Sequence, residues 1–265
     1  VGTGPGSANV LGGTFFAVKT TGRCVDDMVV KDPVAMKCAF GENPKRFYKG
    51  RGNEVRMATA AHLREMLLKA SDYKERKEAA GDDPLKRPVL NREIPLKAHA
   101  HQANDILTAI RIAKEFHVKL TLEHTTEGNL IVDELVKAGY PCAVGPSLGH
   151  ATKFELQNKT WTTPGVLAKA GCQVSIITDA PVTPQKYLSL CAAMAVRAGM
   201  EPYEALKAIT INPAKHLGIE DRVGSLEVGK DADILIFSGD PLDGISLPDQ
   251  VLIDGKLIEN TSGQL

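Results

Sequence analysis

The chain has 265 residues, of which 43% are hydrophobic, enough to bury the core of one large domain or two modest ones. Lysine plus arginine and aspartate plus glutamate both number 32, so the formal net charge of zero argues against a nucleic-acid partner or an anionic membrane surface. No apolar run approaches the ~20 residues that span a bilayer. The cysteines are scattered and lack CxxC spacing, which predicts free thiols in a reducing compartment and hence a cytoplasmic location.

The first 90 residues give only weak indications of their secondary structure. The chain opens with the glycine-rich stretch "VGTGPGSANVLGG", which lacks the GK[ST] of a phosphate-binding loop and predicts a plain strand-to-helix turn. Because almost no strand precedes this turn, we expect further sequence upstream. The segments "FFAVKTTG" (15–22) and "VAMKCAFG" (34–41) are candidate barrel strands. Residues 58–80 predict a long helix, and residues 81–88 a loop.

From residue 90 onward, apolar runs alternate with segments of helical periodicity. The predicted strands are 94–100, 118–124, 140–145 and 173–179, and the predicted helices are 104–116, 127–139, 162–171, 185–199 and 201–210. This alternation predicts an α/β fold with a parallel sheet. Several βα units in so short a length favour a TIM-like (β/α)8 barrel, with a doubly wound sheet as the alternative.

After residue 222 the pattern changes to short strands separated by glycine and aspartate turns. The dipeptide Asp254–Gly255 between "VLI" and "KLI" predicts a tight β-hairpin. A β module of this size is too small to be stable alone. We therefore expect a barrel over residues 1–222 and a small β-sandwich portion over residues 223–265.

Residues able to bind a metal follow the predicted strands. His99 and His101 lie two residues apart in one strand and therefore point to the same face. His124 ends the next strand and Asp179 ends another, so their side chains are expected to meet at the carboxyl ends of a barrel. Imidazole and carboxylate suit a divalent ion such as Zn²⁺. The alternative is that the histidines are ordinary hydrogen-bonded polar residues and that Asp179 is a helix N-cap.

Four stretches resemble the metal-dependent amidohydrolase superfamily, and in particular its imidazolonepropionase-like branch. They are "HAH" (99–101), "EHTTEG" (123–128), "ITDAPVTP" (177–184) and "AITINPAKHLGIEDRVGSLEVGKDADILIFSGDPLD" (208–243). The last of these is similar to that superfamily's final barrel helix followed by its small β-sandwich. The resemblance extends over roughly residues 1–258.

The resemblance implies roles for individual residues. His99 would be the fifth-strand metal ligand, His124 the sixth-strand ligand, and Asp179 the eighth-strand ligand and general base. His101 would line the substrate pocket. Separately from the resemblance, His150 lies in the loop after the strand at 140–145, where it could touch the substrate. Lys37 falls where some relatives carry a carboxylated lysine that bridges two metals, although a lysine whose stem merely covers apolar surface, or a carboxylate from Glu42, remains an alternative.

The resemblance also has two gaps. The superfamily's first-strand HxH pair is absent, and both this pair and the first half of the β-sandwich would lie upstream of Val1. The implied fold is therefore a (β/α)8 barrel lacking its first strand, with the C-terminal part of a small β-sandwich. Ala180 stands where close relatives often carry histidine.

The sequence therefore predicts a metal-dependent hydrolase of C–N bonds. It would act on a small cyclic amide, N-acyl or dipeptide-type molecule through a metal-activated water, with Asp179 as general base. Zinc is the expected metal, with iron or manganese as alternatives, and a homo-oligomer is an open option. Two other interpretations stay open: a non-catalytic fragment of such an enzyme, and a doubly wound binding protein whose histidines do not converge.

Overall fold

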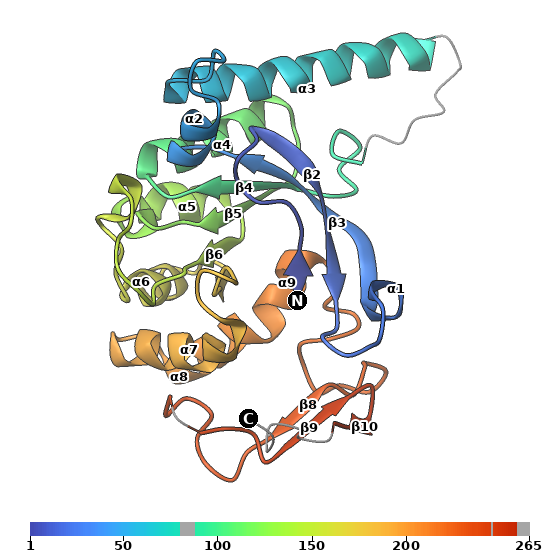
Figure 1. Ribbon diagram of the computed structural model, residues 1–265, viewed down its shortest axis with the longest axis vertical. Helices are drawn as coiled ribbons and strands as arrows, with labels where there is room; N and C mark the ends of the chain where they lie inside the picture. Colours follow the sequence, from blue (N-terminus) through green and yellow to red (C-terminus); the bar gives the residue numbers. More distant parts are fainter. Residues whose placement is uncertain (80–87, 245, 259–265) are drawn as a thin grey trace.

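The computed structural model describes residues 1–79, 88–244 and 246–258, so the predicted loop 81–88 lies outside the described residues apart from its last residue. One seven-stranded sheet dominates the fold, with strands in sequence order (Figure 1). The strands are β1 (Gly2–Thr3), β2 (Leu11–Val18), β3 (Val29–Ala39), β4 (Leu96–Ala100), β5 (Leu120–His124), β6 (Cys142–Val144) and β7 (Val174–Ile176). Strands β3 to β7 are parallel, as the βα pattern predicts.

The sheet curls into a half-barrel rather than closing into an eight-stranded barrel (Figure 1). The prediction that residues 15–22 form a barrel strand is wrong, because β2 pairs antiparallel with β3. Only about ten residues, including the short helix α1 (Val25–Met28), join the two strands, and a parallel crossover needs a longer connection. The candidate strand 34–41 does belong to the parallel set, as the second half of β3.

Helices cover the convex side of the curled sheet and its lower edge (Figure 1). After α1 they are α2 (Glu42–Phe47), α3 (Arg56–Ala79), α4 (Ala103–Glu115), α5 (Val132–Ala138), α6 (Thr163–Lys169), α7 (Leu188–Arg197), α8 (Pro202–Ile209) and α9 (Ile211–Leu217). Single 3-10 turns stand at η1 (Gly128–Leu130), η2 (Phe154–Leu156) and η3 (Gln185–Tyr187). The predicted helix 127–139 is thus a 3-10 turn followed by α5.

The two faces of strands β4 and β5 differ in chemistry because successive side chains alternate. Apolar residues such as Leu96 and Leu122 share one buried cluster with Ile106 of α4. The opposite, concave face carries polar side chains that are nonetheless buried: Lys37, Lys97, His99, Thr121 and Glu123. This polar interior is the frame on which the candidate site is built.

A separate antiparallel sheet contains β8 (Ile234–Ile236), β9 (Gln250–Ile253) and β10 (Lys256–Leu257). The predicted hairpin is confirmed: Asp254 and Gly255 have φ values of 52° and 72°, as a type I′ turn requires. The Lys19 ammonium, at the end of β2, pairs with Asp231 at 2.8 Å and Asp233 at 2.9 Å, and also with Asp254. These ion pairs join the small sheet to the large one.

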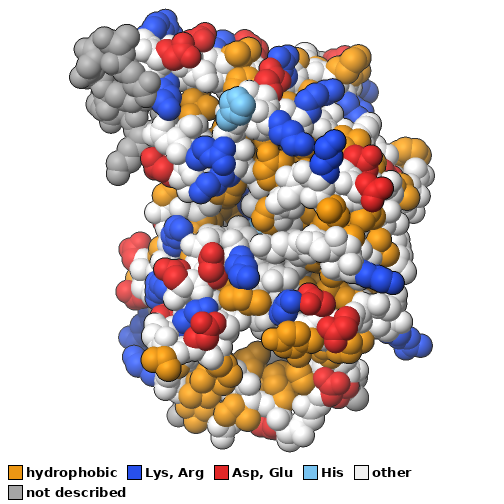
Figure 2. Space-filling view, turned by 180° about the vertical axis from the view of Figure 1, so that it is seen from behind, with side chains coloured by type: hydrophobic (Ala, Val, Ile, Leu, Met, Phe, Trp, Pro, Cys, Tyr) orange, Lys and Arg blue, Asp and Glu red, His pale blue; other side chains and the backbone are white. Residues whose placement is uncertain are grey.

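The small sheet leaves much apolar surface uncovered. Hydrophobic side chains gather at the lower end of the molecule, which this sheet and its connections form (Figure 2). Leu226, Val228, Leu235, Leu247 and Leu257 are all exposed there. Among the described residues, one three-stranded sheet represents the predicted β-sandwich portion. No helix in the described ranges is both long and apolar enough to cross a membrane.

Candidate metal centre

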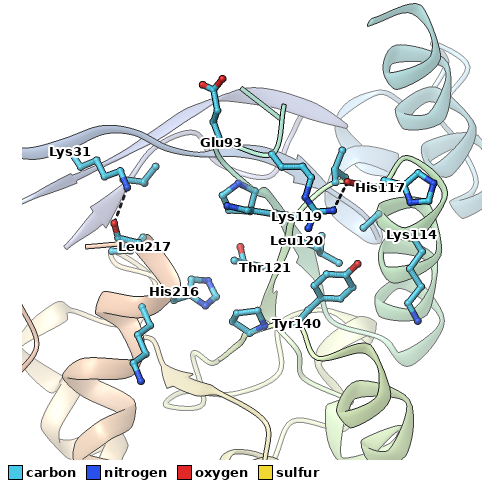
Figure 3. A pocket seen from close by; sticks show the side chains of 18 residues that line it. Lys31, Glu93, Lys114, His117, Lys119, Leu120, Thr121, Tyr140, His216 and Leu217 are labelled. Carbon is cyan, nitrogen blue, oxygen red and sulfur yellow. Dashed lines mark hydrogen bonds between the residues drawn. The ribbon is translucent and has the colours of Figure 1, made fainter. Parts of the chain in front are cut away.

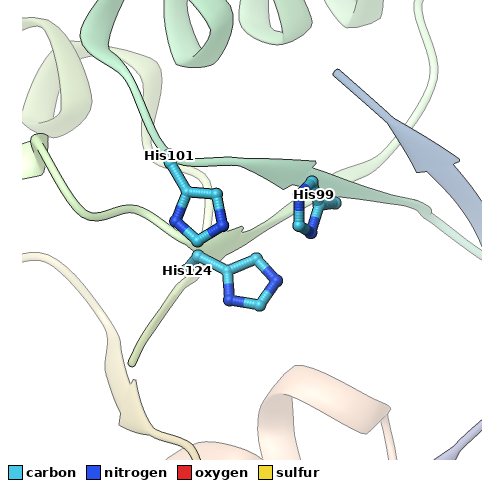
Figure 4. A group of neighbouring side chains, drawn as sticks. All are labelled: His99, His101 and His124. Atoms are coloured by element: carbon cyan, nitrogen blue, oxygen red, sulfur yellow. The ribbon is translucent and has the colours of Figure 1, made fainter. Parts of the chain in front are cut away.

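Three histidines converge at the carboxyl ends of β4 and β5 (Figure 4). One nitrogen from each of His99, His101 and His124 lies within 4.8 Å of the others. The ring of His124 stacks against that of His101, with centroids 4.4 Å apart, and the ring of His99 meets both edge-on. All three side chains are buried. The prediction that His99 and His101 share one face of their strand is confirmed.

His124 reaches this cluster by a different route from the one that strand alternation suggests. His99 pairs in register with Glu123, and both face the concave side of the sheet, so strict alternation would turn His124 toward the helices. Instead, His124 and Thr125 adopt left-handed backbone conformations with φ values of 72° and 43°. Such conformations cost roughly 1–3 kcal/mol each outside glycine and persist where the surrounding structure holds them. Here they bring the imidazole to the concave side.

The carbonyl of Gly145 orients His124. The Nδ1–H of His124 donates to the Gly145 oxygen at 2.8 Å, which leaves Nε2 with its lone pair free to bind a metal. Gly145 has a φ of 133°, and a Cβ added there would lie 2.2 Å from the carbonyl oxygen of Ile177. Glycine is therefore required at the position that orients the imidazole.

The hydrogen bonds of the other two imidazoles are less complete than those of His124. Nδ1 of His101 lies 2.7 Å from the hydroxyl of Thr126, and Nε2 of His99 lies 3.5 Å from the Asn43 amide nitrogen. Nδ1 of His99 is buried and has no hydrogen-bond partner among the described residues. Leaving a buried polar atom unpaired costs about 1–3 kcal/mol, so such an atom calls for a missing partner.

The charge state of the cluster suits a metal ion. Burial, reinforced by the neighbouring His124, lowers the pKa of His99 and of His101 well below the ordinary range. Burial also lowers the pKa of His124, although the Asp179 carboxylate opposes the shift. Neutral imidazole is the form that binds Zn²⁺. Two zinc–nitrogen bonds of roughly 2.0–2.1 Å span at most about 4.2 Å, so small ring movements would let three nitrogens share one ion.

These shifts make the stability of the metal-free chain depend on pH. Since the folded pKa values lie below the unfolded value of about 6.5, the stabilisation is complete above pH 6.5 and is lost as the pH falls toward the folded values. Each histidine that titrates contributes a slope of about 1.4 kcal/mol per pH unit. Urea unfolding with EDTA between pH 7.5 and 5.5 should show this loss, and His99→Gln should flatten it. The same flattening in His62→Gln, a partly exposed histidine of helix α3 outside the cluster, would contradict the assignment.

The other residues that the sequence singled out lie around the cluster. Lys37 is buried in β3, where burial lowers its pKa and the neighbouring Lys97 adds to the effect. Asp179 follows β7 with a φ of 51°, is exposed, and lies outside the group of three histidines. His150 is exposed in the loop after β6. The roles predicted for these three residues stay predictions.

A second polar cluster, not predicted from the sequence, lies beneath the histidines. Glu123 accepts hydrogen bonds from the Lys97 ammonium and from Nε2–H of His216, each at 2.7 Å. Burial alone would raise the pKa of Glu123, but Lys97 and His216 hold it well below its usual range. Burial lowers the pKa of His216, so the group consists of a lysine–glutamate ion pair and a neutral imidazole. Glu123 precedes His124, so this cluster anchors the strand that carries a candidate ligand.

Two loops are tied together over the same end of the sheet. Glu155 is fully buried, and one of its carboxylate oxygens accepts from the Glu42 backbone N–H at 2.8 Å. The Glu42 carboxylate accepts from the Glu155 N–H at 2.9 Å in return. Glu42, considered from the sequence as an alternative to Lys37, is thus engaged in holding loops. Lys153 donates to the Asn43 side chain at 2.7 Å and completes the link.

Residues 91–258 match the model of the amidohydrolase family, which is more than half of the chain. The chain belongs to the amidohydrolase family of enzymes. It is 28% identical to amidohydrolase tasK of Hapsidospora irregularis over 95% of its own length and 29% of that protein. It is also 32% identical to the imidazolonepropionase of Symbiobacterium thermophilum, over 54% of this chain and 33% of that enzyme, and is thus a distant homologue of the imidazolonepropionases.

The fold matches a solved structure closely. The crystal structure of an amidohydrolase from Thermotoga maritima MSB8 superposes with a TM-score of 0.91 at 42% sequence identity. The match covers 96% of this chain and 70% of that one. The chain spans about a third of the length of the two curated relatives described above.

Proposed function

We propose that this chain carries the metal centre of a hydrolase that cleaves C–N bonds in small molecules. The observation that carries the proposal is the buried cluster of three neutral imidazoles at the carboxyl ends of β4 and β5. His99 and His124 would hold a divalent ion, most simply zinc, with His101 as a third ligand or as a neighbour of the substrate. Asp179 would complete the site from the end of β7.

A divalent ion bound there would lower the pKa of a bound water to about 7, far below that of free water. The residues of the chain supply the remaining steps. The Asp179 carboxylate is close enough to act on the charge of His124, and in this role it takes the proton of the attacking water. It then returns that proton to the leaving nitrogen. Lys37, whose pKa is lowered by burial, would be the amine that adds carbon dioxide and releases a proton to form a carbamate if a second ion is bound.

Substitution of Asp179 tests this role. Asp179→Asn should lower kcat by about 10²–10⁴-fold, the usual contribution of a general acid–base group, while most of the bound metal is retained. Asp26→Asn, which removes an exposed carboxylate in α1, is the matched control and should leave kcat unchanged. The substrates to screen are cyclic amides, N-acyl amino acids and dipeptides. Full activity of Asp179→Asn would overturn the assignment.

The exposure of Asp179 outside the histidine cluster favours one alternative, a chain that binds metal without turnover. Measuring metal content and hydrolysis on the same protein preparation distinguishes the two possibilities. About one equivalent of zinc together with hydrolysis of any screened substrate supports the enzyme. Zinc without hydrolysis across all substrate classes supports the binding-only alternative.

A further inference from the structure

A second cavity lies at the opposite ends of the same strands. It has a volume of about 660 Å³ and is lined by residues that precede β4, β5 and β6, together with α9 and the start of β3 (Figure 3). The histidine cluster is at the carboxyl ends of β4 and β5. Thr121 is the cavity residue farthest along β5, and it lies three residues before His124, a separation of about 10 Å at roughly 3.3 Å per residue. The cavity is therefore distinct from the candidate metal centre.

The lining of this cavity is strongly cationic. Lys31, Arg92, Lys114, Lys119 and Lys215 line it, and Glu93 is the one carboxylate among the lining residues. The chain as a whole has equal numbers of acidic and basic residues, so this excess of positive charge is local. Like charges around one cavity repel each other and raise its affinity for anions.

None of these five cations has a carboxylate partner among the described residues. The Lys31 ammonium donates to the Gly218 carbonyl at 2.8 Å, and the Arg92 guanidinium to the His117 carbonyl at 2.9 Å. These bonds hold two of the cations in place without neutralising them. A purely structural rim would instead be expected to pair its charges, as Arg64 and Glu115 do on α3 and α4.

The deep part of the cavity contains polar groups that also lack partners. Thr121 and His216 both line it and are more than nine-tenths buried, and Oγ1 of Thr121 and Nδ1 of His216 have no hydrogen-bond partner in the part of the chain that the structure describes. Because Nε2–H of His216 donates to Glu123, its Nδ1 carries a lone pair that calls for a donor. Figure 3 shows the His216 ring reaching from α9 toward Thr121 on β5.

We propose that this cavity binds a small, multiply charged anion bearing phosphate or carboxylate groups. The volume lies within the range of about 300–1,000 Å³ that is typical of small-molecule sites. The five cations would pair with the charged groups of the anion. At the inner end of the cavity, Thr121 and His216 would form hydrogen bonds with a hydroxyl or N–H of the same molecule. This proposal does not depend on the proposed function of the metal centre.

Calorimetric titration of the full chain with pyrophosphate and with citrate, at about 0.15 M salt, tests the proposal and distinguishes the two anion chemistries. We expect saturable binding of at least one of them. Lys119→Ala, just before β5, and Lys215→Ala, in α9, should each weaken that binding about tenfold, the loss of one charge-assisted contact. Both side chains are exposed, so the variants should fold.

Two controls locate the binding. Lys256→Ala removes the same charge from the small sheet and should leave the affinity unchanged. His99→Ala removes a candidate metal ligand and should also leave it unchanged, which excludes binding of the probe to a metal at the histidine cluster. Absence of binding by both probes up to about 10 mM, or equal weakening in Lys119→Ala and Lys256→Ala, would overturn the proposal.

Discussion

Substitution of His99 with alanine is expected to weaken zinc binding by more than about 100-fold, because even residues that only orient a metal ligand contribute about 10–100-fold. Within residues 1–79, 88–244 and 246–258, His99 is the one imidazole of the cluster whose buried Nδ1 has no protein partner, so a metal is the group best placed to satisfy it. A competition titration with a chromogenic chelator gives the affinity directly. The matched control is His62→Ala, which removes a partly exposed histidine from α3 and should bind zinc as the unaltered chain does.

Thermal unfolding provides an independent measure of the same event. Zinc at 1,000 times its dissociation constant should stabilise the folded chain by about 4 kcal/mol, and His99→Ala should lose nearly all of this gain. If His99→Ala retained both the affinity and the stabilisation, the three histidines would be an ordinary polar cluster. The assignment of the cluster as a metal centre would then be wrong, while the assignment of the chain to the amidohydrolase family would stand.

Substitution of Glu123 with alanine is expected to lower the free energy of unfolding by about 3–5 kcal/mol. The change leaves the Lys97 ammonium buried without its counter-ion and removes the acceptor of the His216 imidazole. Glu115→Ala, which breaks an exposed ion pair with Arg64, is the matched control and should cost less than about 1 kcal/mol. Equilibrium urea unfolding compares the two variants.

A combined variant separates the unpaired charge from other effects of the substitution. Replacing Lys97 with Met, Glu123 with Leu and His216 with Phe removes every polar member of the cluster at similar volume. Such replacements are often neutral or stabilising, so the triple variant should recover most of the stability that Glu123→Ala loses. A loss of stability in the triple variant as large as in Glu123→Ala would show that shape, rather than charge, makes this cluster important.

Much of the candidate site could be predicted from the sequence because strand periodicity is a local property. The spacing of His99 and His101 was enough to place them on one face, and the βα pattern was enough to predict parallel strands. The position of His124 depends on a backbone torsion that the strand pattern does not encode. The prediction that His124 joins the cluster therefore rested on its place at a strand end and not on the alternation of side chains along the strand.

The cluster of Lys97, Glu123 and His216 shows what the sequence analysis missed and why. Its members are 26 to 119 residues apart in the chain and meet only after the sheet has curled and α9 has packed against it. One signal was present: lysine and glutamate interrupt the apolar strands "LKAHA" and "LTLEH" at alternate positions, which indicates a polar face. The antiparallel pairing of β2 gave no comparable signal, because a short strand has the same pattern in either direction.

Gly145 performs two tasks that cannot be altered separately. Its carbonyl sets the direction of the His124 ring, and its lack of a Cβ allows the close approach of the Ile177 carbonyl, which lies just after β7. In a mutational library of this protein, position 145 should therefore tolerate no substitution, even under selection for folding alone. Loop exchange intended to change the substrate can begin after Pro146 but not before it. In this chain, the backbone whose conformation must be kept therefore ends at the peptide bond between Gly145 and Pro146.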